Sequence, residues 1–384
     1  MKVKLKAAAV RQFSVILILC LLVQPVCFAA PGSTASAKPE VSAESAILMC
    51  PDGRVICEKN ADEPRAMAST TKIMTALIAI ENLSPDAVVT VPDEAVGVEG
   101  SSMYLQKGET LTVRDLLYAL MLQSANDAAT ALAVLAAGSV ERFADMMNDR
   151  AAEMGLTSTH FVNPHGLDHP DHYTTARELA KITSEALKNE TFAAITSTFK
   201  YSYTTDLKSG IFVNHNKLLW QMENCVGGKT GFTKKTGRCL VSVTDNDKVI
   251  FICVTLSDPD DWNDHKTLHS YGRSLTRIEP GAADGEFTFE LPVINGTAPK
   301  ITCSNVEGEP FAILDGDDIG YEVELPRFLY APVNAGDVCG RILIRSAGAQ
   351  VGEMDIVALA GSENVEYKNL LERILDFIKG LFDK

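Results

Sequence analysis

The sequence predicts an α/β protein with a mixed, largely antiparallel sheet covered by helices, followed by a small all-β domain and a C-terminal amphipathic helix. Three observations lead to this prediction. In residues 44–278, strand-like runs stand near both ends and the pattern between them is mainly helical. Residues 281–361 contain short strand-like runs separated by Gly, Asp, Asn or Pro. Residues 364–384 repeat apolar positions at helical spacing.

The N-terminus has the features of a secretory signal peptide, residues 1–29. Four basic residues precede an apolar run from Val15 to Val23, and a small-x-small cleavage site ends at Ala29. The run is short for a transmembrane helix, and an uncleaved anchor is the alternative. Residues 30–43 are small, polar and proline-bearing, so we expect a linker there. These features predict an exported protein.

The charge of the chain narrows its partners. The formal net charge is −15 at pH 7, and removal of the signal peptide, which holds four basic and no acidic residues, makes it −19. This excess argues against a nucleic-acid partner. It also argues against simple electrostatic attraction to an anionic membrane or cell wall.

Cysteines give a less direct signal. Seven remain after the signal peptide, an odd number for an exported protein. Cys50 and Cys57 flank the Asp52-Gly53 turn, and a two-residue hairpin would pair Cys50 with Val55. The two sulfurs would then be diagonal neighbours, a poor geometry for a disulfide. We therefore expect buried, reduced thiols, with the Cys50–Cys57 bridge as the alternative.

The elements of the first domain follow in order. After the hairpin, helices are expected at Ser69–Asn82, at Val113–Ala137 with an interruption near Ser124, from Ser139 to Gly155, and after a capping box at Thr175–Glu178. Strands are expected at 225–230, 237–243 and 248–256. Early and late strands around a helical middle predict one sheet whose two halves join in space.

The C-terminal segment 364–384 has one broad apolar face, formed by Tyr367, Leu370, Leu371, Ile374, Leu375, Ile378, Leu381 and Phe382. Basic and acidic residues on its other face are equal in number, so binding to lipid would come from inserting the apolar face. We expect an in-plane membrane anchor. A helix docked on its own β domain or on a second copy of the chain is the alternative.

Lys72 raises the first chemical question, because it lies in the first turn of an apolar helix. A buried ammonium needs a partner or a lowered pKa. Ser69 lies three residues earlier, on the same helical face, and a neutral lysine there could act as the base that a serine nucleophile requires. A lone S-x-x-K also fits a helix cap followed by a snorkelling lysine.

Two further motifs change that balance. Gln123–Asp127 interrupts an apolar helical region with hydroxyl, amide and carboxylate groups, which is costly unless they face a cleft; a helix-helix turn is the alternative. Gly227–Thr233 places a lysine and two hydroxyls on a glycine-flanked strand whose backbone can approach a ligand. An edge strand protected by lysine is the alternative there.

In this order, S-x-x-K, S-x-N and K-T-G resemble the motifs of penicillin-binding proteins and serine β-lactamases. The segments "PRAMASTTKIMTALIAIE", "LMLQSANDAATALA", "THFVNPHGLDHPDHYTTARELA", "GGKTGFTKKTGRCL" and "DWNDHKTLHSYG" resemble the D-alanyl-D-alanine carboxypeptidases, the low-molecular-mass penicillin-binding proteins. The resemblance implies the penicillin-binding/β-lactamase-like transpeptidase fold. The all-β segment and the C-terminal helix match the accessory domain and anchor of that family in position.

The resemblance also implies roles for individual residues. Ser69 is the expected nucleophile, Lys72 its general base, and Ser124 the relay of a proton to the leaving amine. Asn126 is expected to orient the substrate amide. The oxyanion hole would come from the backbone N–H groups of Ser69 and Phe232.

The remaining substrate-binding residues lie on one strand. Lys229 and Thr230 would receive the terminal carboxylate, and Gly231, Phe232 and Thr233 complete this strand. Many relatives have a polar residue or histidine where this chain has Phe232, so a side-chain role there is not implied.

The implied activity is that of a serine-type D-Ala-D-Ala carboxypeptidase. It would remove the terminal D-alanine from peptidoglycan stem pentapeptides through an acyl-enzyme and would bind penicillin covalently at the same serine. No cofactor and no metal are implied. The expected partners are the stem peptide, β-lactams and, through the C-terminal helix, the membrane surface. The expected location is the outer face of the cytoplasmic membrane or the cell wall.

Three other interpretations compete. His160, His165, His169 and His172 crowd one loop and suggest a metal site, although no regular spacing aims their rings. A class A β-lactamase needs a glutamate that activates the deacylating water, and no E-x-x-L-N segment lies between Asn126 and Lys229. A non-catalytic penicillin-binding sensor is the third, and turnover of a D-Ala-D-Ala peptide would separate it from an enzyme.

Overall fold

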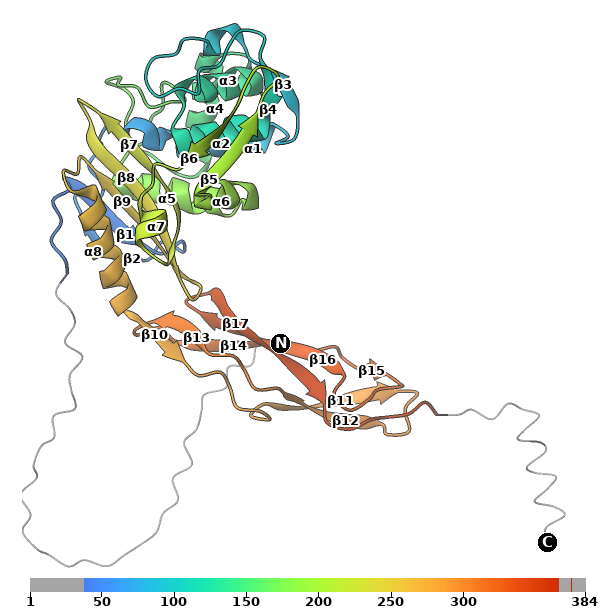
Figure 1. Cartoon of the computed structure of the whole chain (residues 1–384). Coiled ribbons are helices and arrows are strands. Elements are labelled where there is room, and N and C mark those ends of the chain that lie inside the picture. The colour runs from blue at the N-terminus through green and yellow to red at the C-terminus, as the bar shows by residue number, and fades with distance from the viewer. Residues whose placement is uncertain (1–37, 366–373, 375–384) are drawn as a thin grey trace, which may run out of the picture. The chain divides into compact units, whose positions relative to one another are not determined.

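The computed structural model describes residues 38–365 and residue 374 (Figure 1). The predicted signal peptide, most of the predicted linker and nearly all of the predicted C-terminal helix lie outside these residues. The described chain forms two compact units, the first ending at Thr276 and the second beginning at Arg277. Among the described residues, no helix has the length and apolar composition needed to cross a membrane.

A five-stranded sheet organises the first unit, and residues from both ends of the unit build it. The strand order is β2 (Val55–Lys59), β1 (Ser45–Met49), β9 (Val249–Leu256), β8 (Gly237–Asn246) and β7 (Cys225–Thr233). Blue β1 therefore lies beside gold β9 in Figure 1. The prediction that early and late strands join in one sheet is confirmed. All four pairings are antiparallel, so the expected mixture of directions is absent from this sheet.

Helices cover both faces of the sheet. The helices of this unit are α1 (Lys72–Asn82), α2 (Val113–Tyr118), α3 (Asn126–Ala137), α4 (Val140–Glu153), α5 (Ala176–Leu187), α6 (Glu190–Ser197), α7 (Leu218–Gln221) and α8 (Asp261–Ser274). α5 and α6 pack on the sheet, and α2, α3 and α4 pack mainly on other helices. Ile252 and Val254 of β9 enter the main core with Leu77 of α1, while α8 packs on the opposite face. Side chains alternate between the two faces along each strand, which allows one sheet to support both layers.

The predicted interruption near Ser124 is confirmed, whereas the expected helix Ser69–Asn82 begins as a 3-10 turn. The segment from Ala68 to Thr71 is a 3-10 turn that leads directly into α1. The apolar region 113–137 is divided by a π-helical turn, Ala119–Gln123, and by Ser124 in the left-handed conformation at φ 59°. Two small hairpins, β3 (Val88–Thr90) with β4 (Thr110–Thr112) and β5 (Lys200–Thr204) with β6 (Ser209–Val213), were not predicted.

Two local predictions are corrected. The first hairpin pairs Met49 with Val55 across a bulge, and Cys50 instead donates its N–H to the Arg54 carbonyl, so the expected Cys50–Val55 pair is wrong. A longer turn than Asp-Gly alone explains the shift in register. Cys57 lies opposite Leu48. The seven cysteines among the described residues are buried and form no disulfide with one another.

The second correction concerns the capping box at Thr175. The Thr175 hydroxyl accepts the N–H of Glu178 as predicted. The Glu178 carboxylate, however, does not return to the cap; it accepts the N–H groups of Thr157 and Ser158. A full reciprocal box is formed at Thr112 and Asp115. Glu178 thus fixes the start of a distant loop as well as its own helix.

The second unit is the predicted all-β domain. Its six-stranded sheet has the order β14 (Ile319–Glu324), β16 (Val338–Ser346), β17 (Ala349–Ala358), β12 (Lys300–Asn305), β11 (Thr288–Ile294) and β15 (Leu329–Tyr330). β10 (Thr276–Glu279) pairs with β13 (Phe311–Leu314). The edge pair of β11 with β15 is parallel, and the other pairs of the large sheet are antiparallel.

Candidate active site

Ser69 and Lys72 meet at the junction of the 3-10 turn and α1. The Lys72 Nζ lies 3.0 Å from the Ser69 Oγ, within hydrogen-bond distance. Lys72 has no exposed surface, whereas Ser69 is partly exposed. The two side chains therefore differ in solvent access although they are in contact. A ligand can therefore reach the Ser69 hydroxyl, whereas water cannot reach the Lys72 amine next to it.

The surroundings of Lys72 favour the neutral amine. Burial and then the positive charge of Lys229 lower its pKa well below the ordinary lysine value, and Asp127 opposes them weakly. Besides contacting Ser69, the amine donates to Asn126 Oδ1 and to the His165 carbonyl, each at 2.7 Å. When the amine is neutral, its two N–H groups are used by Asn126 Oδ1 and the His165 carbonyl, and its lone pair is left for the Ser69 hydroxyl. This is the arrangement that a general base requires.

Ser124 and Lys229 form a second pair beside the first. The Lys229 Nζ donates to the Ser124 Oγ at 3.0 Å and to the Thr230 carbonyl at 2.8 Å. The left-handed backbone of Ser124, directly after the π-helical turn, places this residue between two helices. Burial lowers the pKa of Lys229 to about 7. An anion bound beside it would favour its protonated form.

Asn126 links the Lys72 amine to the loop that contains Glu99 and Ser101. Its Oδ1 accepts from Lys72, and its Nδ2 donates to the Glu99 carbonyl at 2.6 Å. Its backbone N–H donates to the Ser101 carbonyl. One N–H of the side-chain amide remains for a ligand. The residue is 4% exposed, so in this structure it mainly orients Lys72.

Strand β7 forms the other wall and brings its backbone close to the serine. A Cβ on Gly231 would lie 3.1 Å from the backbone nitrogens of Ser69 and Thr70, so glycine allows this approach. The Thr233 hydroxyl lies 2.8 Å from Asp168 Oδ1. Thr230 is partly exposed beside this wall. Phe232 is 64% exposed and pairs with Arg238 of β8, away from the buried lysines.

The structure therefore brings together Ser69, Lys72, Ser124, Asn126 and Lys229, and places β7 beside them. Sequence reasoning missed the contributions of the 160–173 loop, namely the His165 carbonyl and the close approach of Gly166. In the sequence, this loop is distinguished only by its histidines and its family resemblance. A glycine followed by Leu167 and Asp168 gives no chemical signal, because the relevant groups are a backbone carbonyl and a missing Cβ.

Gly166 gives a direct test of this packing. Its φ is +87°, and a Cβ there would lie 1.9 Å from the Ala68 carbonyl oxygen, beside the serine. Gly166→Ala is expected to destabilise the protein by about 2–4 kcal/mol and to slow acylation by a β-lactam. Urea unfolding and the acylation rate measure the two effects. Gly108→Ala is the matched control, because Gly108 has a φ of +76° but open space around it. Equal effects of the two changes would show that backbone strain, and not contact with Ala68, is responsible.

The loop histidines have structural partners. The His172 Nε2 lies 2.8 Å from the Thr71 hydroxyl, and its Nδ1 accepts the Val162 N–H. The His160 Nδ1 lies 2.6 Å from the Asp171 carbonyl. Burial lowers the pKa of His165 to about 3 and that of His172 to about 4, so both are neutral. The loop is thus held by its own hydrogen bonds.

Elsewhere in this unit, Cys253, His265 and His269 come close enough to resemble a metal-binding group. Each ring nitrogen of the two histidines already has a hydroxyl partner. Ser242 bridges His265 and His269 at 2.6 and 2.7 Å, Thr255 contacts His265 at 3.0 Å, and Thr244 contacts His269 at 2.9 Å. Burial keeps the pKa of both histidines low. This network therefore satisfies the polar groups between α8 and the sheet.

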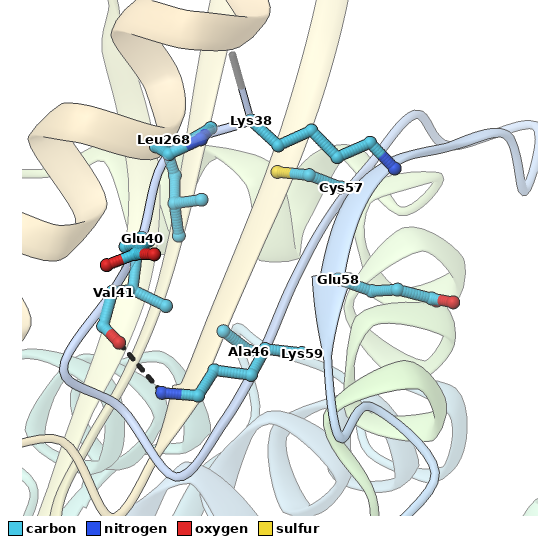
Figure 2. Close-up of a pocket in the computed structure, with 9 residues that line it drawn as sticks. Lys38, Glu40, Val41, Ala46, Cys57, Glu58, Lys59 and Leu268 are labelled. Carbon is cyan, nitrogen blue, oxygen red and sulfur yellow. Dashed lines mark hydrogen bonds between the residues drawn. The ribbon is translucent and has the colours of Figure 1, made fainter.

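Figure 2 shows a pocket that is separate from the predicted site residues. It is lined by Lys38, Pro39, Glu40, Val41, Ala46, Cys57, Glu58, Lys59 and Leu268. The Lys59 amine donates to the Val41 carbonyl at 2.8 Å, the dashed line in the figure. None of the predicted site residues lines this pocket.

Comparison with known proteins places this geometry in context. Residues 32–260 match peptidase family S11, described as D-alanyl-D-alanine carboxypeptidase. The chain is 32% identical over 380 residues to D-alanyl-D-alanine carboxypeptidase DacC of Escherichia coli K12, covering 93% of this chain and 92% of the relative. It is 29% identical over 373 residues to D-alanyl-D-alanine carboxypeptidase DacF of Bacillus subtilis, covering 93% and 95%.

Solved structures give the same result. Penicillin binding protein 5 from Haemophilus influenzae matches with a TM-score of 0.60 at 25% identity, covering 85% of this chain and 99% of that chain. D-alanyl-D-alanine carboxypeptidase from Mycobacterium tuberculosis H37Rv matches with a TM-score of 0.59 at 30% identity, covering 62% of this chain and 93% of that chain. The predicted penicillin-binding fold is confirmed. The chain belongs to the D-alanyl-D-alanine carboxypeptidase family of serine peptidases, peptidase family S11.

Proposed function

We propose that this chain removes the terminal D-alanine from peptidoglycan stem pentapeptides, with Ser69 as the nucleophile and Lys72 as its base. The observation that carries the proposal is the 3.0 Å contact between a partly exposed hydroxyl and a fully buried amine. Family membership supports the reaction, and the contact supports the assignment of residues. β-Lactams, which present a reactive acyl group to the same serine, are the corresponding covalent inhibitors.

In the acylation step, the neutral Lys72 amine accepts the Ser69 proton as the oxygen attacks the carbonyl of the penultimate D-alanine. The negative charge that develops on the carbonyl oxygen is assigned to the backbone N–H groups of Ser69 and Phe232. The close approach of Gly231 to the Ser69 nitrogen supports this assignment, because it brings the β7 backbone beside the serine. Lys72 is protonated when the tetrahedral intermediate forms.

Collapse of the intermediate breaks the peptide bond and releases D-alanine. The leaving nitrogen needs a proton, and the proposed source is the Lys72 ammonium, whose proton passes through the Ser124 hydroxyl so that Lys72 becomes neutral again. The contact of Ser124 with Lys229 orients this hydroxyl. Asn126 is assigned to the substrate amide through its remaining N–H, while its Oδ1 holds Lys72. Water then attacks the acyl-enzyme and gives a proton to the neutral Lys72 amine. Lys72 returns this proton to the Ser69 oxygen as the ester bond breaks and the shortened peptide is released.

The terminal carboxylate of the substrate is assigned to Lys229 and Thr230, with Gly231 and Thr233 completing the strand. Lys229→Ala is expected to narrow the rate difference between a peptide with a free terminal carboxylate and its amide-blocked analogue, by about tenfold. The ratio of the two acylation efficiencies measures this effect. Lys234→Ala is the control, because Lys234 is an exposed lysine next to the same strand. An unchanged ratio in Lys229→Ala would contradict the assignment.

We also propose a division of the chain into domains. Residues 44–278 form the catalytic domain, 281–361 the accessory domain, and 364–384 an in-plane membrane anchor, behind a signal peptide at 1–29 and a linker at 30–43. The enzyme would then act at the outer face of the cytoplasmic membrane, in or near the cell wall.

Liposome flotation of the mature protein and of a form ending at Gly361 tests the anchor. The anchor is wrong if both forms float equally or neither floats.

Release of D-alanine tests the reaction itself. The purified mature protein is incubated with a pentapeptide that ends in D-Ala-D-Ala, and free D-alanine is measured over time. Repeated turnover is expected. A single covalent event with penicillin and no D-alanine release would support a penicillin-binding sensor instead of a carboxypeptidase.

A further inference from the structure

A patch of large apolar side chains lies on the β15 edge of the second unit. Ile294, Phe328 and Tyr330 are 40%, 41% and 67% exposed, and they form the patch together with Arg327. The rings of Phe328 and Tyr330 meet edge to face at 5.3 Å between centroids. Ile294 is the register partner of Tyr330 across the parallel β11–β15 pair. The three apolar side chains therefore share one side of the edge.

The strand alternation shows that this side faces away from the core. Val293 and Leu329, the neighbouring register pair, pack into the core of the second unit. In β-strands successive side chains point to opposite faces, so Ile294 and Tyr330 point outward. Exposed aromatic residues beside an exposed isoleucine are costly in water. Their position at one edge indicates a surface that another phase or molecule covers.

The patch lies beside the point at which the described chain ends. The Val365 N–H donates to the Asn295 carbonyl, and the Thr297 N–H donates to the Glu363 carbonyl. Asn295 directly follows Ile294 of the patch. These hydrogen bonds place Val365 beside Asn295, which is one residue from the register partner of Tyr330. Residues 366–384, whose sequence carries the apolar face described above, begin at this point.

We propose that this patch is a second membrane contact, which enters the interfacial region of the bilayer together with the segment 364–384. The inference rests on the proposed membrane anchor and adds to it a site on the folded β domain. Tyr and Phe are suited to the lipid–water interface, where an apolar ring meets polar headgroups. Arg327, exposed and without an ion-pair partner among the described residues, can contact lipid phosphate.

The chemistry of the patch favours a membrane over a second copy of the chain. β15 has only two residues, so it offers little backbone for pairing with another edge strand. A single anchoring segment would leave the β domain free to rotate about residue 365. A second contact within a few residues would instead fix the orientation of this domain at the surface.

A fluorescent probe on the full mature chain tests the proposal. Tyr330→Cys is labelled with the polarity-sensitive dye NBD, which is selective because the cysteines of the described chain are buried. Tyr321→Cys on β14, the opposite edge of the same sheet, is the control, since Tyr321 is also exposed. Vesicles of phosphatidylcholine with phosphatidylglycerol are added. The emission at position 330 is expected to shift to the blue and that at position 321 to stay unchanged.

A binding measurement complements the probe. Phe328→Ser combined with Tyr330→Ser is expected to weaken vesicle binding of the full mature chain about fivefold, because two interfacial aromatic rings are lost. Tyr321→Ser combined with Val323→Ser is the matched control and is expected to have no effect. An unchanged circular dichroism spectrum and thermal unfolding curve of the full mature chain show that each variant is folded; penicillin acylation reports only on the first unit.

The possible outcomes separate this proposal from the anchor. If the chain binds vesicles but the probe at position 330 does not respond, the patch is not a membrane contact and the anchor stands. If the chain does not bind vesicles at all, the anchor fails and the inference fails with it. A blue shift at position 330 that grows with protein concentration in the absence of vesicles would assign the patch to self-association and overturn the proposal.

Discussion

Penicillin is expected to add one covalent adduct to the mature protein, and Ser69→Ala is expected to abolish both this adduct and D-alanine release. Ser69 combines contact with the buried Lys72 amine and a partly exposed hydroxyl, whereas Ser124, which contacts the buried Lys229 amine, is itself buried, so Ser69 is the expected nucleophile. Removal of a nucleophile of this type lowers turnover by about 10⁴-fold or more. Intact-mass analysis after incubation with penicillin measures the adduct.

The control for this change is the stability of the variant. Alanine suits a helical turn, and the hydroxyl of Ser69 contributes a single hydrogen bond to the fold, so the melting temperature is expected to change little. Ser124→Ala offers a comparison within the site, because it is expected to slow adduct formation without preventing it. An adduct of the same mass in Ser69→Ala would place the nucleophile elsewhere.

Lys72→Arg is expected to abolish acylation by penicillin, with a loss of at least about 10³-fold. A guanidinium remains protonated at all accessible pH values and cannot accept the serine proton. In the wild-type protein the acylation rate is expected to rise with pH as Lys72 loses its proton. Because the pKa of Lys72 lies well below its ordinary value, this rise is expected at a lower pH than for a solvated lysine. Stopped-flow acylation by a chromogenic β-lactam measures the profile.

Two further variants show whether a loss of acylation in Lys72→Arg comes from the missing base or from misfolding. Lys72→Met keeps the length of the side chain and removes the amine, so it is expected to be equally inactive. Its melting temperature is expected to stay near that of the wild type, because the cost of burying an amine is removed while Asn126 Oδ1 and the His165 carbonyl lose a donor. Lys181→Arg, at an exposed position, is expected to leave acylation unchanged. Near-normal acylation by either Lys72 variant would remove Lys72 from the base role.

Much of the fold could be predicted because its signals are local. The apolar spacing of α1, the cap at Ser139 and the alternation of β11 each depend on residues close together in sequence. The hairpin register at Met49 could not be predicted, because a bulge of one residue leaves the apolar pattern nearly unchanged. Glu178 was assigned to its own helix, but tertiary contact drew its carboxylate to Thr157.

The site divides in the same way. Ser69 and Lys72 were predictable as a pair because their contact lies within one helical turn. The contact of Lys229 with Ser124 joins residues far apart in the chain, and only the family resemblance linked the two motifs. The His165 carbonyl and the close approach of Gly166 carry no side-chain signal. Backbone groups supplied by loops are the part of a site that residue identity describes least.

The position of β1 in the main sheet has a consequence for how the enzyme is made. β1 pairs with β9, so Ala46 lies opposite Thr255, and neither strand can complete its ladder until both have left the ribosome and reached the same compartment. Contacts of such large sequence separation slow folding, because a long loop must close before they form. Ser69 emerges early, whereas Lys229 and its supporting strands emerge much later. The proposed site of Ser69, Lys72, Ser124 and Lys229 therefore cannot assemble until the late strands join the sheet, and we expect no peptidase activity from a chain that ends before Lys229.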